Sequence, residues 1–330
     1  MLNPNLHLNP KIFDSDVETA PTRAGYGKGL LELGGKNPNV VVLSADLTES
    51  THSHLFAEKY PDRFFEVGIG EQNMAAIAAG LAVTGKIPFI ASYATFSPGK
   101  NWETIRTTIA YNQANVKIAG HHAGVMTGPD GATHQATEDV AIIRALPGIE
   151  IMVACDSIEA KKATIASCQT DSPVYLRYTR DKTPIMTTEQ TPFEKGKNQT
   201  FWICTEPICT IFATGYLLHE ALLAARELEN EQINTLVVNV STIKPLDEDG
   251  ILNSLSATRA AVTVEDHQVV GGLAGAISEL LALRDPLPVE FVGLQKTFAE
   301  SGTPKELIKK YKMDKDAIKT AVKKVIARKT

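Results

Sequence analysis

Short apolar runs rich in β-branched residues alternate with longer stretches in which apolar residues recur every three or four positions. The short runs predict strands, and the longer stretches predict helices. The expected strands span residues 40–43, 63–67, 87–91, 116–119, 149–153 and 174–177. The expected helices span residues 23–33, 74–83, 102–111, 138–145 and 157–168. Such alternation is typical of a mostly parallel sheet covered on both faces, so we expect an α/β fold.

The alternation stops between residues 183 and 207, where Pro184, Pro192 and Gly196 lie among polar residues. This composition predicts a linker. Strands are expected again at residues 209–213, 235–240, 260–264 and 289–292, and helices at 217–228, 247–255, 273–283, 304–311 and 314–327. The sequence therefore predicts two three-layer α/β domains, at residues 21–185 and 208–330, with an N-terminal arm at 1–20 and a linker at 186–207.

Composition narrows the classes of partner. Hydrophobic residues make up 43% of the 330 residues and charged residues 22%, which fits a globular protein long enough for two domains. The net charge is −5 and no Lys/Arg run precedes Lys323-Lys324, so nucleic acid is not an expected partner. The N-terminus lacks a secretory pattern and no apolar run is long enough to span a membrane, so we expect a cytoplasmic protein without a membrane partner.

Four cysteines bear on redox chemistry. They are Cys155, Cys168, Cys204 and Cys209. Their spacing does not match that of metal ligands, so reduced and packed cysteines are expected. A redox pair of Cys204 and Cys209 is the alternative.

Glu71 follows a predicted strand and the glycine turn Gly68-Ile69-Gly70. It therefore lies in the first turn of a predicted helix, where the helix dipole favours negative charge. An ordinary α/β helix can begin with such a carboxylate, so Glu71 alone does not indicate a site.

A glycine-rich loop follows the strand expected at residues 116–119. It contains His121, His122, Asp130 and His134. The loop is too polar for a core and lies at the carboxyl end of a parallel strand, where open sheets place their ligands. The histidines lack the i, i+4 spacing of metal ligands on a helix and no cysteine accompanies them, so phosphate binding or proton transfer is favoured over a metal.

A second polar cluster, Val264-Glu265-Asp266-His267, precedes Gly271-Gly272 in the second predicted domain. Its place at the end of a strand suits a ligand position. A solvated strand end before a helix that starts at the glycine pair explains the pattern equally well.

Several stretches, taken in order, resemble the transketolase family. Residues 44–50 (SADLTES), 68–71 (GIGE), 95–96 (TF) and 128–135 (GPDGATHQ) resemble its pyrimidine-binding domain. Residues 241–247 (STIKPLD) resemble the start of its C-terminal domain. The resemblance covers nearly the whole chain. It implies that thiamine diphosphate binds between two α/β domains, usually from two subunits.

The family holds the diphosphate through Mg²⁺ with a Gly-Asp-Gly motif and a later Asn, and this sequence has no such pair at the family spacing. The resemblance therefore implies the C-terminal subunit of a split transketolase, inert by itself and without metal ligands. The diphosphate and Mg²⁺ ligands are expected on an N-terminal partner subunit. An α2β2 heterotetramer with self-pairing of this chain is expected.

The resemblance implies cofactor contacts for three residues. Glu71 is expected to hydrogen-bond the pyrimidine ring and favour its imino tautomer. Phe96 is expected to stack on that ring, with a core aromatic as the alternative, and Asp46 completes the set. The sequence after Phe96 departs from the family pattern, so the other aromatic residues of the pocket have no match. Trp102 and Tyr93 are the candidates to replace them.

The resemblance also implies contacts with the sugar phosphate. The phosphate ligands are expected to be Arg23, Ser50, His122 and Arg180, since guanidinium groups, a hydroxyl and an imidazole suit a dianion. Asp130 matches the residue that reads the acceptor's C2 hydroxyl. His134 matches the histidine beside the cofactor's reactive carbon, which serves the donor's hydroxyls and proton transfer. His121, His52 and His267 have no assigned role.

The implied activity is reversible glycolaldehyde transfer from a ketose phosphate to an aldose phosphate in the non-oxidative pentose phosphate pathway. A deoxyxylulose-phosphate synthase and the β subunit of a 2-oxo-acid dehydrogenase are alternatives. The phosphate ligands and Asp130 favour sugar transfer over the dehydrogenase. A non-catalytic, partner-binding paralogue is the alternative of another class, and Glu71, His122 and His134 argue against it.

Overall fold

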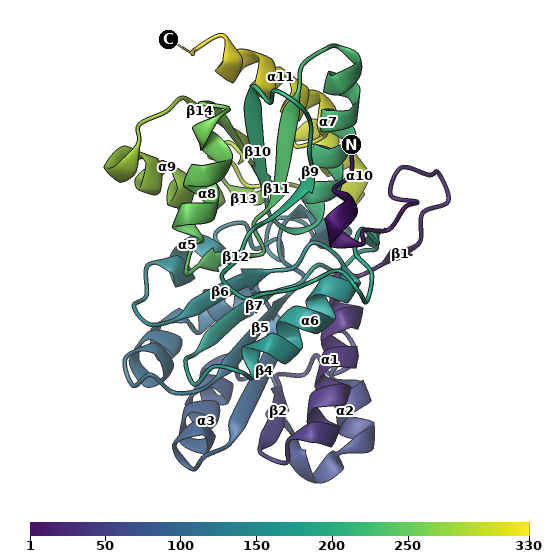
Figure 1. Cartoon of the computed structure of the whole chain (residues 1–330). Helices are drawn as coiled ribbons and strands as arrows, with labels where there is room; N and C mark the ends of the chain where they lie inside the picture. The colour runs from purple at the N-terminus through teal and green to yellow at the C-terminus, as the bar shows by residue number, and fades with distance from the viewer. Residues whose placement is uncertain (330) are drawn as a thin grey trace.

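The computed structural model describes residues 1–329 as two α/β units stacked end to end (Figure 1). A seven-stranded sheet forms the lower unit and a five-stranded sheet the upper unit. A short pair, β1 (Thr19–Ala20) with β8 (Thr183–Pro184), joins the beginning and the end of the first unit. The α/β class expected from the sequence is confirmed.

The first sheet has the strand order β12-β6-β7-β5-β4-β2-β3. Its strands are β2 (Val40–Ser44), β3 (Phe64–Glu66), β4 (Ile87–Tyr93), β5 (Lys117–His121), β6 (Glu150–Val153), β7 (Val174–Arg177) and β12 (Thr242–Lys244). All neighbours are parallel except β12, an edge strand contributed by the second half of the chain. The carboxyl ends of the parallel strands therefore meet at one edge of the sheet.

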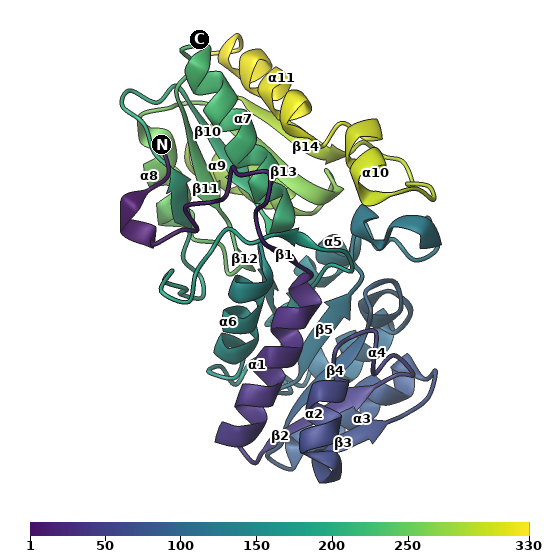
Figure 2. The same cartoon turned by 90° about the vertical axis from the view of Figure 1, so that its right-hand side faces the viewer.

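Helices cover both faces of this sheet (Figure 2). One face carries α1 (Thr22–Lys36), α2 (His54–Lys59) and α6 (Ser157–Ser167), and the other carries α3 (Glu71–Val83) and α5 (Asp139–Arg144). Helices α1 and α6 approach closely at Gly25, where a Cβ atom would lie 1.9 Å from the Ser157 carbonyl oxygen. Only glycine permits this approach, which fixes the first turn of α1 and thus the position of Arg23.

The second sheet has the order β14-β13-β10-β11-β9. Its strands are β9 (Gln199–Trp202), β10 (Cys209–Ala213), β11 (Thr235–Asn239), β13 (Ala261–Gln268) and β14 (Val289–Leu294). Its helices are α7 (Leu218–Asn230), α8 (Glu248–Ser256), α9 (Leu273–Arg284), α10 (Pro304–Lys310) and α11 (Lys315–Ile326). The core packs α7 and α11 against one face and α8 and α9 against the other.

Several segments differ from the expected secondary structure: helix α2 and strand β12 are not among the predicted elements, and two further segments depart from their prediction. Strand β9 lies inside the predicted linker and pairs antiparallel with β11 as an edge strand. The helix expected at residues 102–111 is a short α-helix, α4 (Trp102–Thr104), followed by a π-helix over Ile105–Ala110. The N-terminal segment runs along the second unit (Figure 2), where Ile12 is fully buried. The domain limits stay a prediction.

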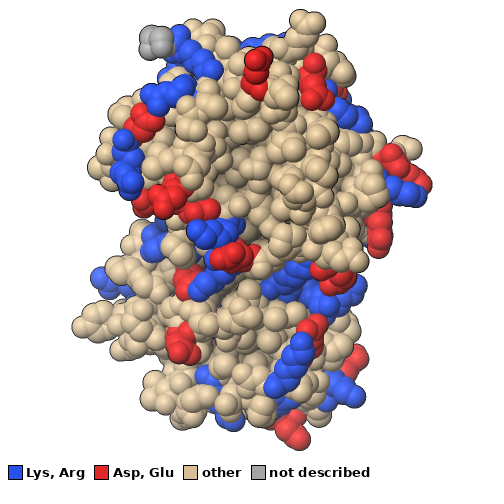
Figure 3. Space-filling view, in the orientation of Figure 1, with Lys and Arg blue, Asp and Glu red and all other residues tan. Residues whose placement is uncertain are grey.

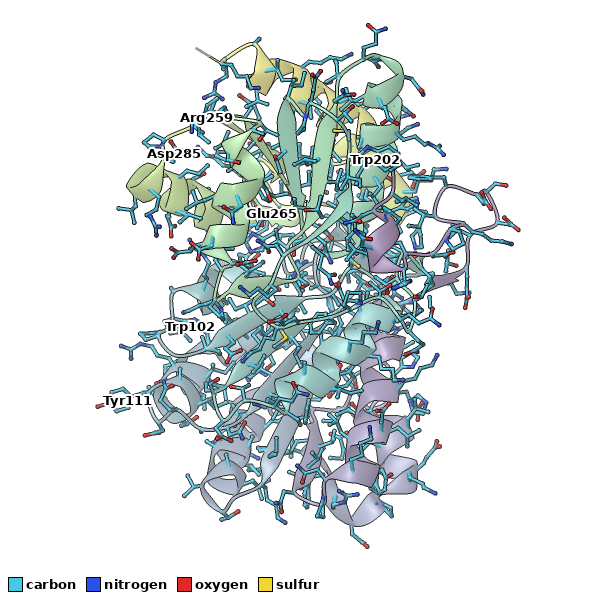
Figure 4. All side chains as sticks on the ribbon, in the orientation of Figure 1. Trp102, Tyr111, Trp202, Arg259, Glu265 and Asp285 are labelled. Atoms are coloured by element: carbon cyan, nitrogen blue, oxygen red, sulfur yellow. The ribbon has the colours of Figure 1, made fainter. Side chains whose placement is uncertain are left out.

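The polar cluster of the second domain is buried, so a solvated strand end is wrong. Glu265 accepts hydrogen bonds from the Leu273 and Ala274 amides at the start of α9, at 2.7 and 2.8 Å. Figure 4 shows Glu265 close to the junction of the two units. Asp266 accepts from the Val125 amide (3.1 Å) in the glycine-rich loop. The cluster thus connects the two units.

Arg177 completes this connection. Its guanidinium donates to Asp139 at 2.7 Å and to the main-chain oxygen of Asp266 at 2.8 Å. Tyr175 also donates to Asp139, at 2.6 Å. Burial alone would raise the pKa of Asp139, but the Arg177 charge and these hydrogen bonds hold it below its ordinary value. The pair is therefore ionised in the interior.

The surface carries both signs of charge, interspersed on the face that Figure 3 shows. Arg259 and Asp285 form one of the exposed ion pairs, at 2.5 Å, in the upper unit (Figure 4). Within residues 1–329, no helix combines the length and the apolar character needed to cross a membrane.

We expect Asp139→Ala to lower the free energy of unfolding by about 3–5 kcal/mol, because Arg177 stays buried without its counter-ion. The matched control is Asp285→Ala, which breaks a half-exposed pair and should cost less than about 1 kcal/mol. Urea denaturation measures both. Equal losses in the two variants would contradict a special role for the buried pair.

Candidate functional site

The residues singled out in the first domain gather where the parallel strands of its sheet have their carboxyl ends. Tyr93 ends β4, His122 follows β5, and Arg180 follows β7. Arg23 lies in the first turn of α1, and Glu71 is the first residue of α3. This edge is where open parallel sheets bind ligands.

Four rings form an aromatic cluster: Tyr93, Phe96, His122 and His134. Tyr93 lies at its centre, with its ring stacked on Phe96 (centroids 5.9 Å apart) and 3.9 Å from that of His122. Phe96 meets His134 edge-on at 5.5 Å. Phe96 is half-buried and lies outside the hydrophobic core, so it presents a ring face that a ligand can cover.

Of the two candidate replacements for the missing aromatics, Tyr93 joins this cluster and Trp102 does not. The Trp102 indole N–H donates to the Ile142 main-chain oxygen at 2.9 Å, and its ring packs against the core of the first unit (Figure 4). Trp102 is therefore a packing residue.

The Glu71 side chain is 2% exposed. Lys100 donates to its Oε2 at 2.8 Å, and Asn101 Nδ2 donates to its main-chain oxygen at 3.0 Å. Among residues 1–329, Lys100 is the one side chain that hydrogen-bonds this carboxylate. Oε1 is thus available to a further donor.

Arg23 links two of the predicted phosphate ligands. Its Nη1 donates to the Ser50 main-chain oxygen at 2.7 Å and to His122 Nε2 at 3.0 Å. An arginine can only donate, so His122 is neutral with its proton on Nδ1. That Nδ1 and Arg23 Nε are buried and have no partner within residues 1–329. Two buried donors without acceptors suit an anion.

Electrostatics at this position also favour an anion. Burial, then the charges of Arg23 and Arg180, lower the pKa of His122 to about 3. Burial lowers the pKa of Arg23, and Arg180 lowers it further. His52 is a residue that the sequence did not assign, and burial and Arg23 lower its pKa too. The positive charges of Arg23 and Arg180 thus repel each other and disfavour protonation of the two histidines, and a bound anion would offset this repulsion.

Arg180 joins the glycine-rich loop. Its Nη1 donates to the Thr127 main-chain oxygen at 2.7 Å and lies 3.5 Å from an oxygen of Asp130. His134 Nδ1 lies 2.9 Å from the Thr133 hydroxyl. The position where an anion would meet Arg23 and His122 is therefore bordered by Asp130, Arg180 and His134.

Asp46 is exposed and lines a cavity of about 200 Å³ together with Ser50 and Glu66. Glu66 Oε1 accepts from the Asp46 amide at 2.7 Å, and its Oε2 accepts from the Thr48 hydroxyl at 2.7 Å. Glu66, which the sequence also left unassigned, thus braces this loop. The Asp46 side chain lies outside the aromatic cluster.

Two other expectations concern metals and thiols. Residues 1–329 contain no group of three or more His, Cys, Asp or Glu side chains placed to hold a metal ion. All four cysteines are free, and burial raises the pKa of Cys209 to about 12. Cys209 is therefore a poor partner for redox exchange.

Comparison with known protein families identifies the family of the chain. The model of the transketolase pyrimidine-binding domain matches residues 18–186, and that of the transketolase C-terminal domain matches residues 203–318. The chain belongs to the transketolase family. Both domains occur in the order predicted from the sequence, and the chain corresponds to the C-terminal subunit of a split transketolase.

Individual relatives match nearly the whole length of this transketolase chain. A transketolase C-terminal section of Methanocaldococcus jannaschii is 42% identical over 299 residues, covering 90% of this chain and 93% of that one. A solved split-gene transketolase, described as an inactive β4 tetramer, has a TM-score of 0.88 and 40% identity, covering 94% of this chain and 99% of its own. Human transketolase is 34% identical over 309 residues, which are 93% of this chain and 49% of that protein.

Transketolases depend on thiamine diphosphate, and the residues here fit its pyrimidine half. A buried carboxylate with one free oxygen lies at the start of α3, and half-buried Tyr93 and Phe96 offer ring faces nearby. The Gly-Asp-Gly and Asn pair that would hold the diphosphate is absent from the sequence.

The buried imidazole predicts a pH dependence. A histidine with a lowered pKa binds fewer protons in the folded than in the unfolded chain, so its contribution to stability is lost as the pH falls from 6.5 toward 3. We expect His122→Gln to flatten the stability curve by up to about 1.4 kcal/mol per pH unit between pH 6 and 4. Urea denaturation across this range measures the slopes. Parallel curves for wild type and variant would contradict a neutral buried His122.

Proposed function

We propose that this chain is the C-terminal subunit of a thiamine-diphosphate-dependent transketolase that transfers a two-carbon ketol unit from a ketose phosphate to an aldose phosphate. The observation that carries the proposal is the pair of buried donors without acceptors, Arg23 Nε and His122 Nδ1, beside the aromatic cluster. These donors suit the phosphate of a sugar whose reacting end reaches the cofactor.

Glu71, Phe96 and Tyr93 would hold the pyrimidine ring. Glu71 would share a proton with a ring nitrogen, which favours the imino tautomer, while the two aromatic rings fix the plane of the pyrimidine. The bound cofactor supplies the carbon nucleophile that accepts and passes on the two-carbon unit. We also propose that Asp46, which lines the cavity beside Ser50 and Glu66, contacts the cofactor.

The substrate would lie between the aromatic cluster and the arginines. Arg23, His122, Arg180 and Ser50 would bind the phosphate, since charge-assisted donors are the strongest ligands of a dianion. Asp130, 3.5 Å from Arg180, would accept from the C2 hydroxyl of the acceptor. His134, with its ring against Phe96, would exchange protons with the donor hydroxyls.

A partner chain completes this proposal. The sequence lacks the diphosphate motif, and the chain matches about half of human transketolase. The similar split-gene protein is described as inactive when it forms a tetramer of β chains alone. We therefore propose an N-terminal subunit that carries the diphosphate and Mg²⁺ ligands, in an α2β2 heterotetramer in which this chain pairs with itself.

The preferred sugar is a separate part of the proposal. A relative from Clostridium sp. strain MSTE9, 36% identical over 317 residues and covering 96% of this chain and 98% of its own, is named a 6-deoxy-6-sulfo-D-fructose transketolase subunit. We propose pentose phosphate chemistry, and the two arginines and the imidazole that gather at one position support an anionic sugar. The alternatives are a deoxyxylulose-phosphate synthase-like enzyme, a 2-oxo-acid dehydrogenase β subunit and a non-catalytic paralogue.

The experiment is steady-state kinetics of the two-subunit complex with ribose 5-phosphate compared against ribose as acceptor. Arg23→Ala and Arg180→Ala should each raise KM for the phosphorylated sugar about 10- to 150-fold, because a charge-assisted hydrogen bond is worth about 1.5–3 kcal/mol. Activity on ribose should change little. The matched control is Arg106→Ala, an exposed arginine of the π-helix, which should change neither.

Equal losses on ribose 5-phosphate and ribose would make the arginines structural and remove the support for sugar-phosphate transfer. A complex that turns over pyruvate but no ketose phosphate would favour the two oxo-acid alternatives. A complex that turns over neither would favour the non-catalytic paralogue.

A further inference from the structure

The ion pair between Lys100 and Glu71 is the feature of the site that the proposed function does not use. Lys100 Nζ lies 2.8 Å from Glu71 Oε2. The carboxylate is 2% exposed, whereas the Lys100 side chain is 48% exposed. The buried charge of Glu71 is therefore neutralised by a residue that reaches it from the solvent side.

The main chain holds Lys100 in position for this contact. Lys100 ends a π-helix over Thr95–Lys100 that is interrupted at Ser97. The next residue, Asn101, is fully buried and donates to both the Glu71 main-chain oxygen (3.0 Å) and the Ser97 hydroxyl (3.2 Å). The segment that carries Lys100 is thus fixed to the first residue of α3.

The Lys100 side chain itself is free to leave. Its ammonium group has one hydrogen-bond acceptor within residues 1–329, which is Glu71. Rotation about its side-chain bonds would carry the half-exposed ammonium into water without moving the fixed main chain. The ammonium regains its full hydration when it moves into water, whereas the buried Glu71 carboxylate stays stable without it only if another donor takes its place.

We propose that Lys100 competes with the cofactor for the Glu71 carboxylate. Lys100 pairs with Glu71 in the cofactor-free chain and releases it when a pyrimidine nitrogen binds the carboxylate. Lys100 is thus a positioning residue. It holds the carboxylate in one orientation before assembly, at the expense of cofactor affinity. This inference rests on the proposed function, because the competing donor is the ring that Glu71 is proposed to bind.

Electrostatics favour competition over sharing of the carboxylate. Although Oε1 is free, the Lys100 ammonium lies 2.8 Å from Oε2, and a ring nitrogen that donates to the same carboxylate carries positive charge as well, so each cation weakens the other's attraction to Glu71. Removing the ammonium should therefore favour the complex with the ring. A lysine that instead helped to hold a negatively charged cofactor would have the opposite effect when removed.

The test is calorimetric titration of thiamine diphosphate, with Mg²⁺ present, into the assembled two-subunit complex. Lys100→Met should lower Kd about tenfold, since the loss of one charge-assisted competitor is worth about a factor of ten. Lys100→Gln, which can still hydrogen-bond Glu71 without a charge, should give a smaller decrease. Lys86→Met, at the residue before β4 and thus at the opposite end of that strand from Tyr93, is the matched control and should leave Kd unchanged.

A double-variant cycle separates competition from a general effect of charge. In the Glu71→Gln background Lys100 has no carboxylate to occupy, so adding Lys100→Met should leave Kd unchanged. A weaker or unchanged Kd for both Lys100→Met and Lys100→Gln would overturn the inference, as would an equal tightening in the Glu71→Gln background. If the wild-type complex binds no thiamine diphosphate at all, the proposed function fails, and the inference fails with it.

Discussion

Arg177 carries a positive charge in the interior where the two units meet, and the position of the candidate site depends on how that charge is paired. Asp139 of the first unit and the main-chain oxygen of Asp266 in the second unit both accept from it. Asp266 in turn accepts from the Val125 amide in the glycine-rich loop. Displacing the second unit would leave the Arg177–Asp139 pair in place but would take the Asp266 acceptors away from the Arg177 guanidinium and the Val125 amide, at about 1–3 kcal/mol for each buried group left unsatisfied. The loop that carries His122 and His134 is therefore held between two fixed units.

The buried polar groups of the site have fewer hydrogen-bond partners than those of this junction. Arg23 Nε and His122 Nδ1 are buried donors without an acceptor in residues 1–329, and each such group costs about 1–3 kcal/mol. The Arg177 network at the junction holds the surrounding fold while these donors stay unpaired. Unsatisfied polar groups beside a rigid scaffold are expected where a ligand completes the hydrogen bonds.

The fold was largely predictable from the sequence because strands and helices have different periodicities. Strand β9 was not predicted because it is a short edge strand within a polar segment that contains prolines, and the composition of that segment indicates a linker. The burial of Glu265 and Asp266 depends on contacts with the first unit, which local patterns cannot show.

The site was predictable only in part. Arg23 and Arg180 lie far apart in the sequence, and the family resemblance alone connected them. His52 has a left-handed backbone (φ 61°) in a loop, which no helix or strand pattern anticipates. Lys100 lies on a π-helix, so α-helical spacing could not place it against Glu71. Tyr93 was named as a candidate, but its central place among the rings needed the three-dimensional structure.

The central claim is that this chain supplies only the pyrimidine side of a cofactor site. Calorimetric titration of thiamine diphosphate and Mg²⁺ into the purified chain, with and without an N-terminal transketolase subunit, tests it most directly. We predict no measurable binding to the chain alone and saturable binding once both chains are present. Tight binding by the chain alone would contradict the claim.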